Sequence, residues 1–141
     1  MYKEQNLIFI FTMLECVEKC GIYTDGFTNP HEFVWADEQM RLNAVISLFI
    51  AIGEESKKID QNLKEDIETK LNWSDVAGIR DKISHDYRGV DAEILWAVIQ
   101  KDLPKLKKAL LEMLELIKPS KELIDEFLDS QFYKHLAYLK R

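Results

Sequence analysis

The sequence contains little glycine and proline, with five glycines and three prolines among 141 residues. A many-stranded sandwich or barrel needs a turn roughly every 8–12 residues, and such turns are rich in these two residues. Basic residues are not in excess either, because 19 Lys and Arg stand against 25 Asp and Glu, a formal charge of −6. This charge excludes a protein that binds nucleic acid with its whole surface, although not one with a local basic patch.

Long apolar runs and cysteine clusters are also missing. No stretch approaches the roughly 20 consecutive apolar residues of a membrane span. The apolar run 7–11 soon meets Glu15 and Glu18 and has no small-residue cleavage site, so we expect no signal peptide. Cys16 and Cys20 lie four residues apart on a predicted helix, where a disulfide would be strained, and no nearby His completes a metal site. We therefore expect reduced cysteines and a cytoplasmic location.

The sequence does contain helical periodicity throughout. Its length allows one domain, and apolar residues, 47% of the chain, suffice for a core. Six helices are predicted, at about 3–20, 30–59, 62–71, 74–85, 92–117 and 120–139. No convincing strand is found. The sequence therefore predicts an all-α, up-and-down helical bundle over residues 1–117, with residues 118–141 as a C-terminal helical extension of the same domain.

Particular residues set the limits of these predicted helices. Gly21 is expected to end the first helix, and Asn29 with Pro30 to begin the second, which has a jog near Asp37. The helix at 92–117 should begin at a cap by Asp91 and be interrupted at Pro104, with Asp102 as a new cap. Ser120 is expected to cap the last helix.

The second predicted helix is apolar around most of its circumference between residues 44 and 52. A helix of this kind is either central in the bundle or in contact with a second subunit. Gly53 interrupts the pattern at a cost of about 1 kcal/mol relative to Ala. We therefore expect another backbone to approach closely at Gly53.

Most catalytic signatures are absent, among them a Gly-rich phosphate loop, a His-Glu-x-x-His zinc motif and a Gly-x-Ser-x-Gly elbow. One segment, residues 80–91, is unusually rich in charged and aromatic groups: Arg80-Asp81-Lys82-Ile83-Ser84-His85-Asp86-Tyr87-Arg88-Gly89-Val90-Asp91. An Arg presents a planar fork of donors that suits phosphate, and a His can carry a proton near neutral pH. An Arg and a His together are the minimum for cleaving RNA without a metal, with the ribose 2′-hydroxyl as nucleophile.

The spacing within this segment leaves two arrangements open. On one regular helix Arg80 and His85 would lie about 140° apart and could not reach the same phosphorus. Either the helix loosens near Ser84, or two copies of the segment face each other across a dimer. Asp81 and His85 are four residues apart and could pair on a helix. His31 and His135 have no partner in the sequence, and Trp73 and Trp96 are interpreted as core residues.

At these residues the sequence resembles the HEPN superfamily and, within it, the HepT-like toxin ribonucleases. The resemblance covers roughly residues 3–117. It rests on residues 41–57 with the Ile-Gly-Glu turn at Gly53 and Glu54, Trp73 seven residues before Arg80, the segment 80–91, and residues 93–104. The pattern Arg-x4-His-x-Tyr followed by Gly-Val-Asp is far more specific than Arg-x4-His alone. The resemblance to this family implies a homodimeric helical bundle that cleaves RNA without a metal, with tRNA among the known targets.

The resemblance also implies roles for single residues. Arg80 would bind and polarise the phosphate, and His85 would act as general base or acid. Tyr87 matches the tyrosine that a nucleotidyltransferase antitoxin modifies with AMP. Supporting roles fall to Asp81, which would orient the site, and to Gly53 and Glu54, which would support the motif and the dimer contact. Lys57, Lys82 and Arg88 are the candidate RNA-binding cations, although relatives often place an apolar or aromatic residue at the position of Arg88.

Two functions from different classes follow. The first is an endoribonuclease toxin held in check by a nucleotidyltransferase antitoxin, without a cofactor. The alternative is a helical interaction module that binds its nucleotidyltransferase partner, or a nucleotide, through the same cleft and cleaves nothing.

Overall fold

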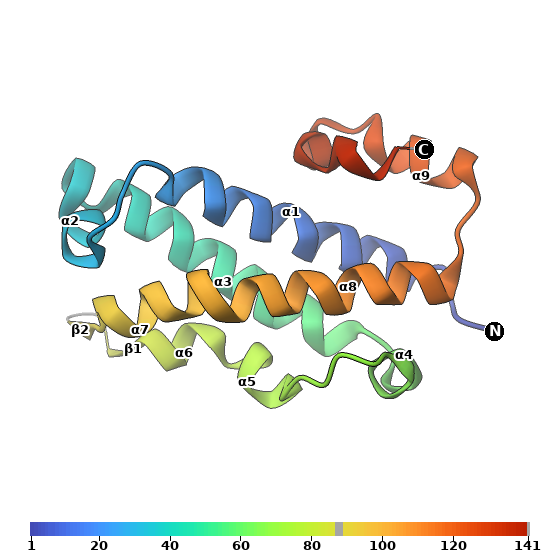
Figure 1. Ribbon diagram of the computed structural model, residues 1–141, viewed down its shortest axis with the longest axis horizontal. Helices are drawn as coiled ribbons and strands as arrows, with labels where there is room; N and C mark the ends of the chain where they lie inside the picture. The colour runs from blue at the N-terminus through green and yellow to red at the C-terminus, as the bar shows by residue number, and fades with distance from the viewer. Residues whose placement is uncertain (87–88, 141) are drawn as a thin grey trace.

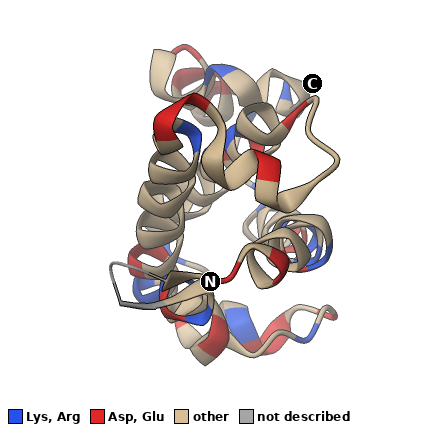
Figure 2. Cartoon of the chain, turned by 90° about the vertical axis from the view of Figure 1, so that its left-hand side faces the viewer, with Lys and Arg blue, Asp and Glu red and all other residues tan. Residues whose placement is uncertain are grey.

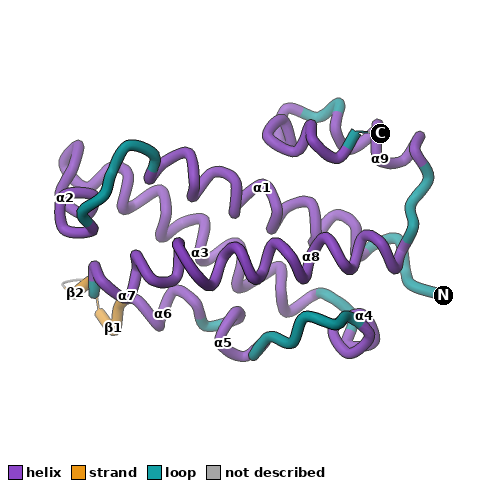
Figure 3. The backbone as a smooth tube through the Cα atoms, in the orientation of Figure 1, coloured by secondary structure: helices purple, strands orange, loops and turns teal. Residues whose placement is uncertain are grey.

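The computed structural model describes residues 1–86 and 89–140, except for the side chains of His85 and Asp86. The described part is almost entirely helical, which confirms the predicted all-α class. Three long helices, α1 (Asn6–Thr24), α3 (Met40–Lys58) and α8 (Leu103–Ile117), run along one another (Figures 1 and 3). The shorter elements are α2 (Pro30–Trp35), α4 (Gln61–Asp66), α5 (Trp73–Ala77), α6 (Ile79–Ile83), α7 (Ala92–Ala97), α9 (Lys121–Leu128) and three irregular helical segments.

The core lies between the three long helices, and α1 contacts both of the others. Fully buried side chains of α1 and α3 fill it, including Phe11, Leu14, Phe49 and Ile52. The α5 and α6 helices pack against α3 on one side of the bundle, and the C-terminal segment packs against α1 on the other (Figure 1). None of the helices described within 1–86 and 89–140 is long and apolar enough to cross a membrane.

Gly21 does not end the first helix, contrary to the sequence prediction. The α1 helix continues to Thr24, whose hydroxyl donates to the carbonyl oxygen of Cys20 at 2.7 Å. A glycine inside a helix costs only about 1 kcal/mol, which the packing of α1 against α3 outweighs. The predicted cap at Asn29 is confirmed, because its side chain accepts hydrogen bonds from the backbone N–H groups of His31 and Glu32.

The expected jog near Asp37 is a complete break. Residues 37–39, within the 3-10 segment η1 (Ala36–Gln39), all have positive φ angles, a backbone region that non-glycine residues rarely adopt. Arg41 stabilises the backbone at this break. Its Nε donates to the Asp37 carboxylate at 2.8 Å, and its Nη1 donates to the carbonyl oxygen of Tyr23 at 3.0 Å. The single helix predicted over 30–59 is therefore two helices with different axes.

The predicted interruption at Pro104 is wrong. A π-helical segment, η2 (Val98–Asp102), joins α7 to α8 without a break. Pro104 lacks the N–H group that a regular helix would use here, and a π turn accommodates the loss without ending the helix. Asp102 makes no capping hydrogen bond and instead pairs with Lys82.

The last helix predicted, over 120–139, is two separate helical segments in the structure. Ser120 caps α9 as expected, by accepting a hydrogen bond from the N–H of Leu123 at 3.1 Å, and a second segment, η3 (Gln131–Leu139), follows. The rings of Phe11 and Phe127 stack with centroids 4.6 Å apart, and His135 forms a short hydrogen bond with the nearly buried Glu15. No sequence pattern indicates this partner of His135, because the two residues lie 120 positions apart.

Gly53 lies where α3 meets α5. A Cβ atom at this position would lie only 2.6 Å from the carbonyl oxygen of Ala77. Real Cβ atoms do not approach backbone oxygens so closely, so only glycine fits. The close backbone approach expected at Gly53 is confirmed.

Glu112 of α8 holds the connection between α4 and α5. Its carboxylate accepts hydrogen bonds from the backbone N–H groups of Glu68, at 2.8 Å, and Thr69, at 3.2 Å, and a short one from the Thr69 hydroxyl. These bonds favour the charged form and lower the pKa of Glu112, the Thr69 hydroxyl most of all. The connection replaces the last turn of the helix predicted over 62–71, since α4 ends at Asp66.

Substitution of Gly53 tests the backbone contact. We expect Gly53→Ala to lower the free energy of unfolding by about 1–3 kcal/mol, because the backbone of Ala77 must move away from the new methyl group. Gly21→Ala is the matched control, since nothing lies within 4 Å of that position, and it should stabilise α1 by about 1 kcal/mol. Urea unfolding measures both, and equal effects of the two substitutions would contradict the close contact.

Replacement of Glu112 tests its anchoring role through pH. Because its pKa is lowered in the folded state, the carboxylate stabilises the fold above its unfolded pKa of about 4.3, and this contribution is lost as pH falls through the lower folded pKa. We expect Glu112→Gln to cost about 1 kcal/mol at pH 7, since solvent screens this exposed group, and less at pH 3. Unfolding curves at both pH values measure this difference. The exposed control Glu126→Gln should change neither value, and a pH-independent cost for Glu112→Gln would argue against the carboxylate.

Candidate functional site

The segment singled out by sequence, residues 80–91, spans α6 from Arg80 onward, two short strands and Asp91, the N-cap of α7. The α6 helix ends at Ile83, and Ser84 has the extended backbone angles φ −154° and ψ 128°. Arg80 therefore lies on a helix, whereas His85 lies on the strand β1 (Ser84–Asp86). The single helix predicted to reach His85 is wrong, because the helix ends at Ile83. The meeting of Arg80 with a His85 from the same subunit or from a second copy stays a prediction.

The two strands form a small hairpin that the sequence analysis missed. β1 pairs antiparallel with β2 (Gly89–Val90), with Ser84 opposite Val90 and Asp86 opposite Gly89. The N–H of Asp91 donates to the carbonyl oxygen of Ile83 at 2.8 Å and closes the base of the hairpin. Strands of two or three residues carry too little periodicity to be recognised in a sequence.

Asp91 ends the hairpin and begins the next helix. Its carboxylate accepts a hydrogen bond from the N–H of Ile94 at 3.0 Å, so the predicted cap is confirmed. The α7 helix also approaches α2, where the exposed ring of His31 lies 4.0 Å from the Glu93 carboxylate. His31 thus has a weak surface partner that the sequence analysis did not find.

Arg80 pairs with its neighbour Asp81 at the start of the segment. It is 31% exposed, and its Nη1 lies 3.4 Å from the Asp81 carboxylate, which is 82% exposed. An exposed pair of this length contributes little to stability, so the guanidinium can exchange this carboxylate for a phosphate. Because the helix ends at Ile83, the four-residue helical spacing that suggested pairing of Asp81 with His85 no longer applies.

Two of the three candidate RNA-binding cations carry acidic partners. Lys82 Nζ lies 3.1 Å from Asp102, and Lys57 Nζ lies 3.3 Å from Glu54, both on the surface. Figure 2, a view from one end of the bundle, shows basic and acidic residues interspersed along the chain. The local positive field is therefore weaker than a count of cations alone suggests.

Three predicted features fall outside the description. Tyr87 and Arg88 lie outside the described residues, as does the side chain of His85.

The two tryptophans near the segment are described, and both pack against the core as interpreted. The ring of Trp96 lies 5.7 Å from that of Phe33, and the Lys64 ammonium lies 5.2 Å from the ring of Trp73.

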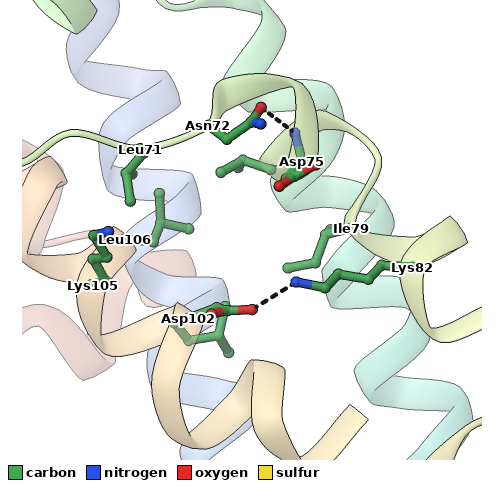
Figure 4. A pocket seen from close by; sticks show the side chains of 10 residues that line it. Leu71, Asn72, Asp75, Ile79, Lys82, Asp102, Lys105 and Leu106 are labelled. Atoms are coloured by element: carbon green, nitrogen blue, oxygen red, sulfur yellow. Dashed lines mark hydrogen bonds and ion pairs between the residues drawn. The ribbon is translucent and has the colours of Figure 1, made fainter. Parts of the chain in front are cut away.

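A pocket of about 200 Å³ opens beside α6. It is lined by residues of the 71–76 segment, by Ile79 and Lys82 of α6, and by residues 102–106 at the start of α8 (Figure 4). The sequence analysis missed it, because Leu71, Asn72 and Leu106 belong to no motif and meet only in the fold.

Within the described ranges, no group of three or more His, Cys, Asp and Glu side chains is arranged to hold a metal ion. Cys16 and Cys20 are both free and buried in α1, as expected. Burial raises the pKa of Cys16 to about 11 and raises that of Cys20 further. Neither thiol is therefore a ready nucleophile at neutral pH.

Comparison with known proteins gives several related sequences. The family model described as Ribonuclease HepT-like matches residues 13–113. A protein of Methanocaldococcus jannaschii, provisionally named an RNase, is 30% identical over 77% of this chain and 95% of its own length. Another, from Caldanaerobacter subterraneus subsp. tengcongensis and also provisionally named an RNase, is 39% identical over 45% of this chain and 56% of its own.

A second Methanocaldococcus jannaschii protein is named a gamma-glutamylcyclotransferase and, provisionally, an RNase. It is 31% identical over 81% of this chain, and the match covers 50% of that protein. The chain thus spans about half the length of this relative and of the Caldanaerobacter one. No solved structure matches the chain significantly. The match to the family model includes α3, the whole of 80–91 and most of α8. It shows that the chain belongs to the Ribonuclease HepT-like family.

Proposed function

We propose that this chain is an endoribonuclease that cleaves RNA without a metal, with Arg80 and His85 as its catalytic residues. The observation that carries the proposal is the family match, which includes all of residues 80–91. The end of α6 at Ile83 supports it, because His85 then follows on a strand and is released from the unfavourable helical angle to Arg80. Gly53 supports the arrangement by letting α5, which precedes Arg80, lie directly against α3.

The proposed reaction uses the RNA itself as nucleophile. Arg80 binds the non-bridging oxygens of the phosphodiester with two N–H groups and stabilises the charge that develops on them. His85 takes the proton of the ribose 2′-hydroxyl as the bond from O2′ to phosphorus forms, or delivers one to O5′ as the bond from phosphorus to O5′ breaks. The products are a 2′,3′-cyclic phosphate and a 5′-hydroxyl.

The surrounding charges are proposed to position the RNA. Asp81 holds the guanidinium of Arg80 until substrate arrives, and Lys57, Lys82 and Arg88 contact the backbone phosphates. Surface pairs such as Lys57 with Glu54 are worth roughly 0–1 kcal/mol, so a phosphate can displace the carboxylate. RNA affinity should accordingly be modest and should fall steeply with salt.

The proposed biological role is that of a toxin, with tRNA as a candidate target. A nucleotidyltransferase antitoxin would silence it by attaching AMP to Tyr87, since added phosphate charge next to the cleft repels an RNA backbone. The proposed homodimer would use the apolar segment of α3. Ile50 there is 49% exposed, and Ile46 and Leu48 are only partly buried, which leaves apolar surface for a second copy.

Cleavage of total tRNA in excess chelator tests the catalytic pair, with an unmodified Tyr87 first confirmed by mass. We expect Arg80→Ala and His85→Ala each to lower the rate by 100-fold or more, on the order of a lost acid–base or charge-stabilising group. Arg80→Lys should recover little, because the ammonium lacks the planar fork. The control His31→Ala removes an exposed histidine outside the segment and should leave the rate unchanged.

Cleavage that persists in both alanine variants would assign the activity to a contaminant. Absence of cleavage by the wild type would instead favour the non-catalytic interaction module. Mixing the two inactive variants separates the two possible sites. If Arg80 of one subunit works with His85 of its partner, mixed dimers regain one intact site and part of the activity, whereas sites within single subunits stay inactive. Light scattering on the same samples gives the oligomeric state.

A further inference from the structure

We propose that the pocket beside α6 binds one nucleobase of the RNA, next to the phosphodiester held by Arg80. The inference rests on the proposed function, because it assigns a subsite to that same reaction. The pocket lies between residues 71–76, α6 and the start of α8, and Arg80 is not among its described lining residues. It is therefore a binding element separate from Arg80.

The shape of the pocket suits a single planar ring. Leu71 and Leu106 lie on one side, and Ile79 lies on the opposite side (Figure 4). Apolar side chains that face each other in this way can contact both faces of a base. A volume of about 200 Å³ is below the roughly 300–1,000 Å³ of clefts that hold drug-sized ligands and suits one base.

Polar groups at both ends of the pocket can meet the edges of a base. Asn72 and Asp75 stand at one end, and Lys82 and Asp102 at the other (Figure 4). The Oδ1 of Asn72 accepts the N–H of Asp75 at 3.1 Å, which leaves its Nδ2 free of hydrogen bonds to the described chain. Each end thus offers a donor beside an acceptor, the combination that base edges present.

Cations lie at the pocket and on another face of α6. Ile79 and Lys82 line the pocket from α6, whereas Arg80 lies about 100° from Ile79 and about 160° from Lys82 around the helix and so projects away from the pocket. Lys105 adds a cation at the pocket, and it forms no ion pair with the described residues. A base in the pocket would thus have its own phosphate within reach of Lys82 and Lys105, and the next phosphate of the RNA chain would pass around α6 to Arg80. A purely apolar ligand would leave these charges unused.

Titration of the labelled protein in NMR tests the pocket without requiring cleavage. The probes are the four nucleoside 5′-monophosphates, ribose 5-phosphate, and 2′-O-methylated dinucleotides that cannot be cleaved. We expect a nucleotide, but not ribose 5-phosphate, to shift the amide signals of Asn72, Asp75 and Lys82. Asn72→Ser should weaken nucleotide binding by about threefold to tenfold, the effect of one lost hydrogen bond.

The substitution is chosen to preserve the fold. Serine caps a helix about as well as asparagine, so Asn72→Ser removes the amide donor and keeps the cap of α5. Asn29→Ser is the matched control, because Asn29 caps α2 in the same way and lies outside the pocket. It should leave nucleotide binding unchanged. Equal weakening by both substitutions would overturn the pocket assignment.

The dinucleotides separate RNA from a free nucleotide as the source of the base. If the pocket serves RNA, a dinucleotide binds more tightly than a monophosphate, and Arg80→Ala removes the gain. A dinucleotide without any gain, or equal shifts with ribose 5-phosphate, would overturn the proposal. If the wild type cleaves no RNA while the dinucleotide binds as expected, the proposed catalysis fails and the base pocket stands. If RNA is cleaved and Asn72→Ser leaves both binding and KM unchanged, the pocket fails alone.

Discussion

The direct contact of the α3 backbone at Gly53 with the carbonyl of Ala77 holds the candidate site in place. A side chain at residue 53 would push away the backbone of Ala77 at the end of α5, and α6 begins only two residues later, at Ile79. Arg80 follows Ala77 by three residues, and the pocket beside α6 shares Val76 and Ile79 with the same region. The glycine thus acts through the position of a backbone rather than through any chemistry of its own.

The second constraint is the change from helix to strand at Ser84. The hydrogen bond from Asp91 to Ile83 closes a short hairpin and turns the chain back toward α7. Catalytic groups on two joined elements can approach one phosphate in a way that one regular helix forbids. The acidic net charge is compatible with this arrangement, because the carboxylates nearest to the cations are exposed and form weak pairs that a phosphate can replace.

Local sequence patterns correctly predicted the helix caps and the close backbone contact, which depend on the type of a single residue. The caps at Asn29, Asp91 and Ser120 and the close contact at Gly53 were all predicted, because each depends on a residue type suited to one backbone geometry. The breaks were not predicted well. The left-handed residues 37–39 depend on a tertiary contact, because Arg41 joins Asp37 to the carbonyl oxygen of Tyr23. The π turn before Pro104 and the hairpin after Ile83 involve too few residues to produce a recognisable periodicity. The pocket and the pairing of His135 with Glu15 join distant segments without any motif.

A crystal structure with a 2′-O-methylated RNA that cannot be cleaved would test the central claim most directly. The account predicts that the Arg80 guanidinium and a His85 imidazole, from the same subunit or its twin, lie within about 3.2 Å of one phosphodiester group or its 2′-oxygen. If the two side chains instead contact different phosphates, or the imidazole points away from the RNA in every copy, the proposed catalytic pair would be contradicted.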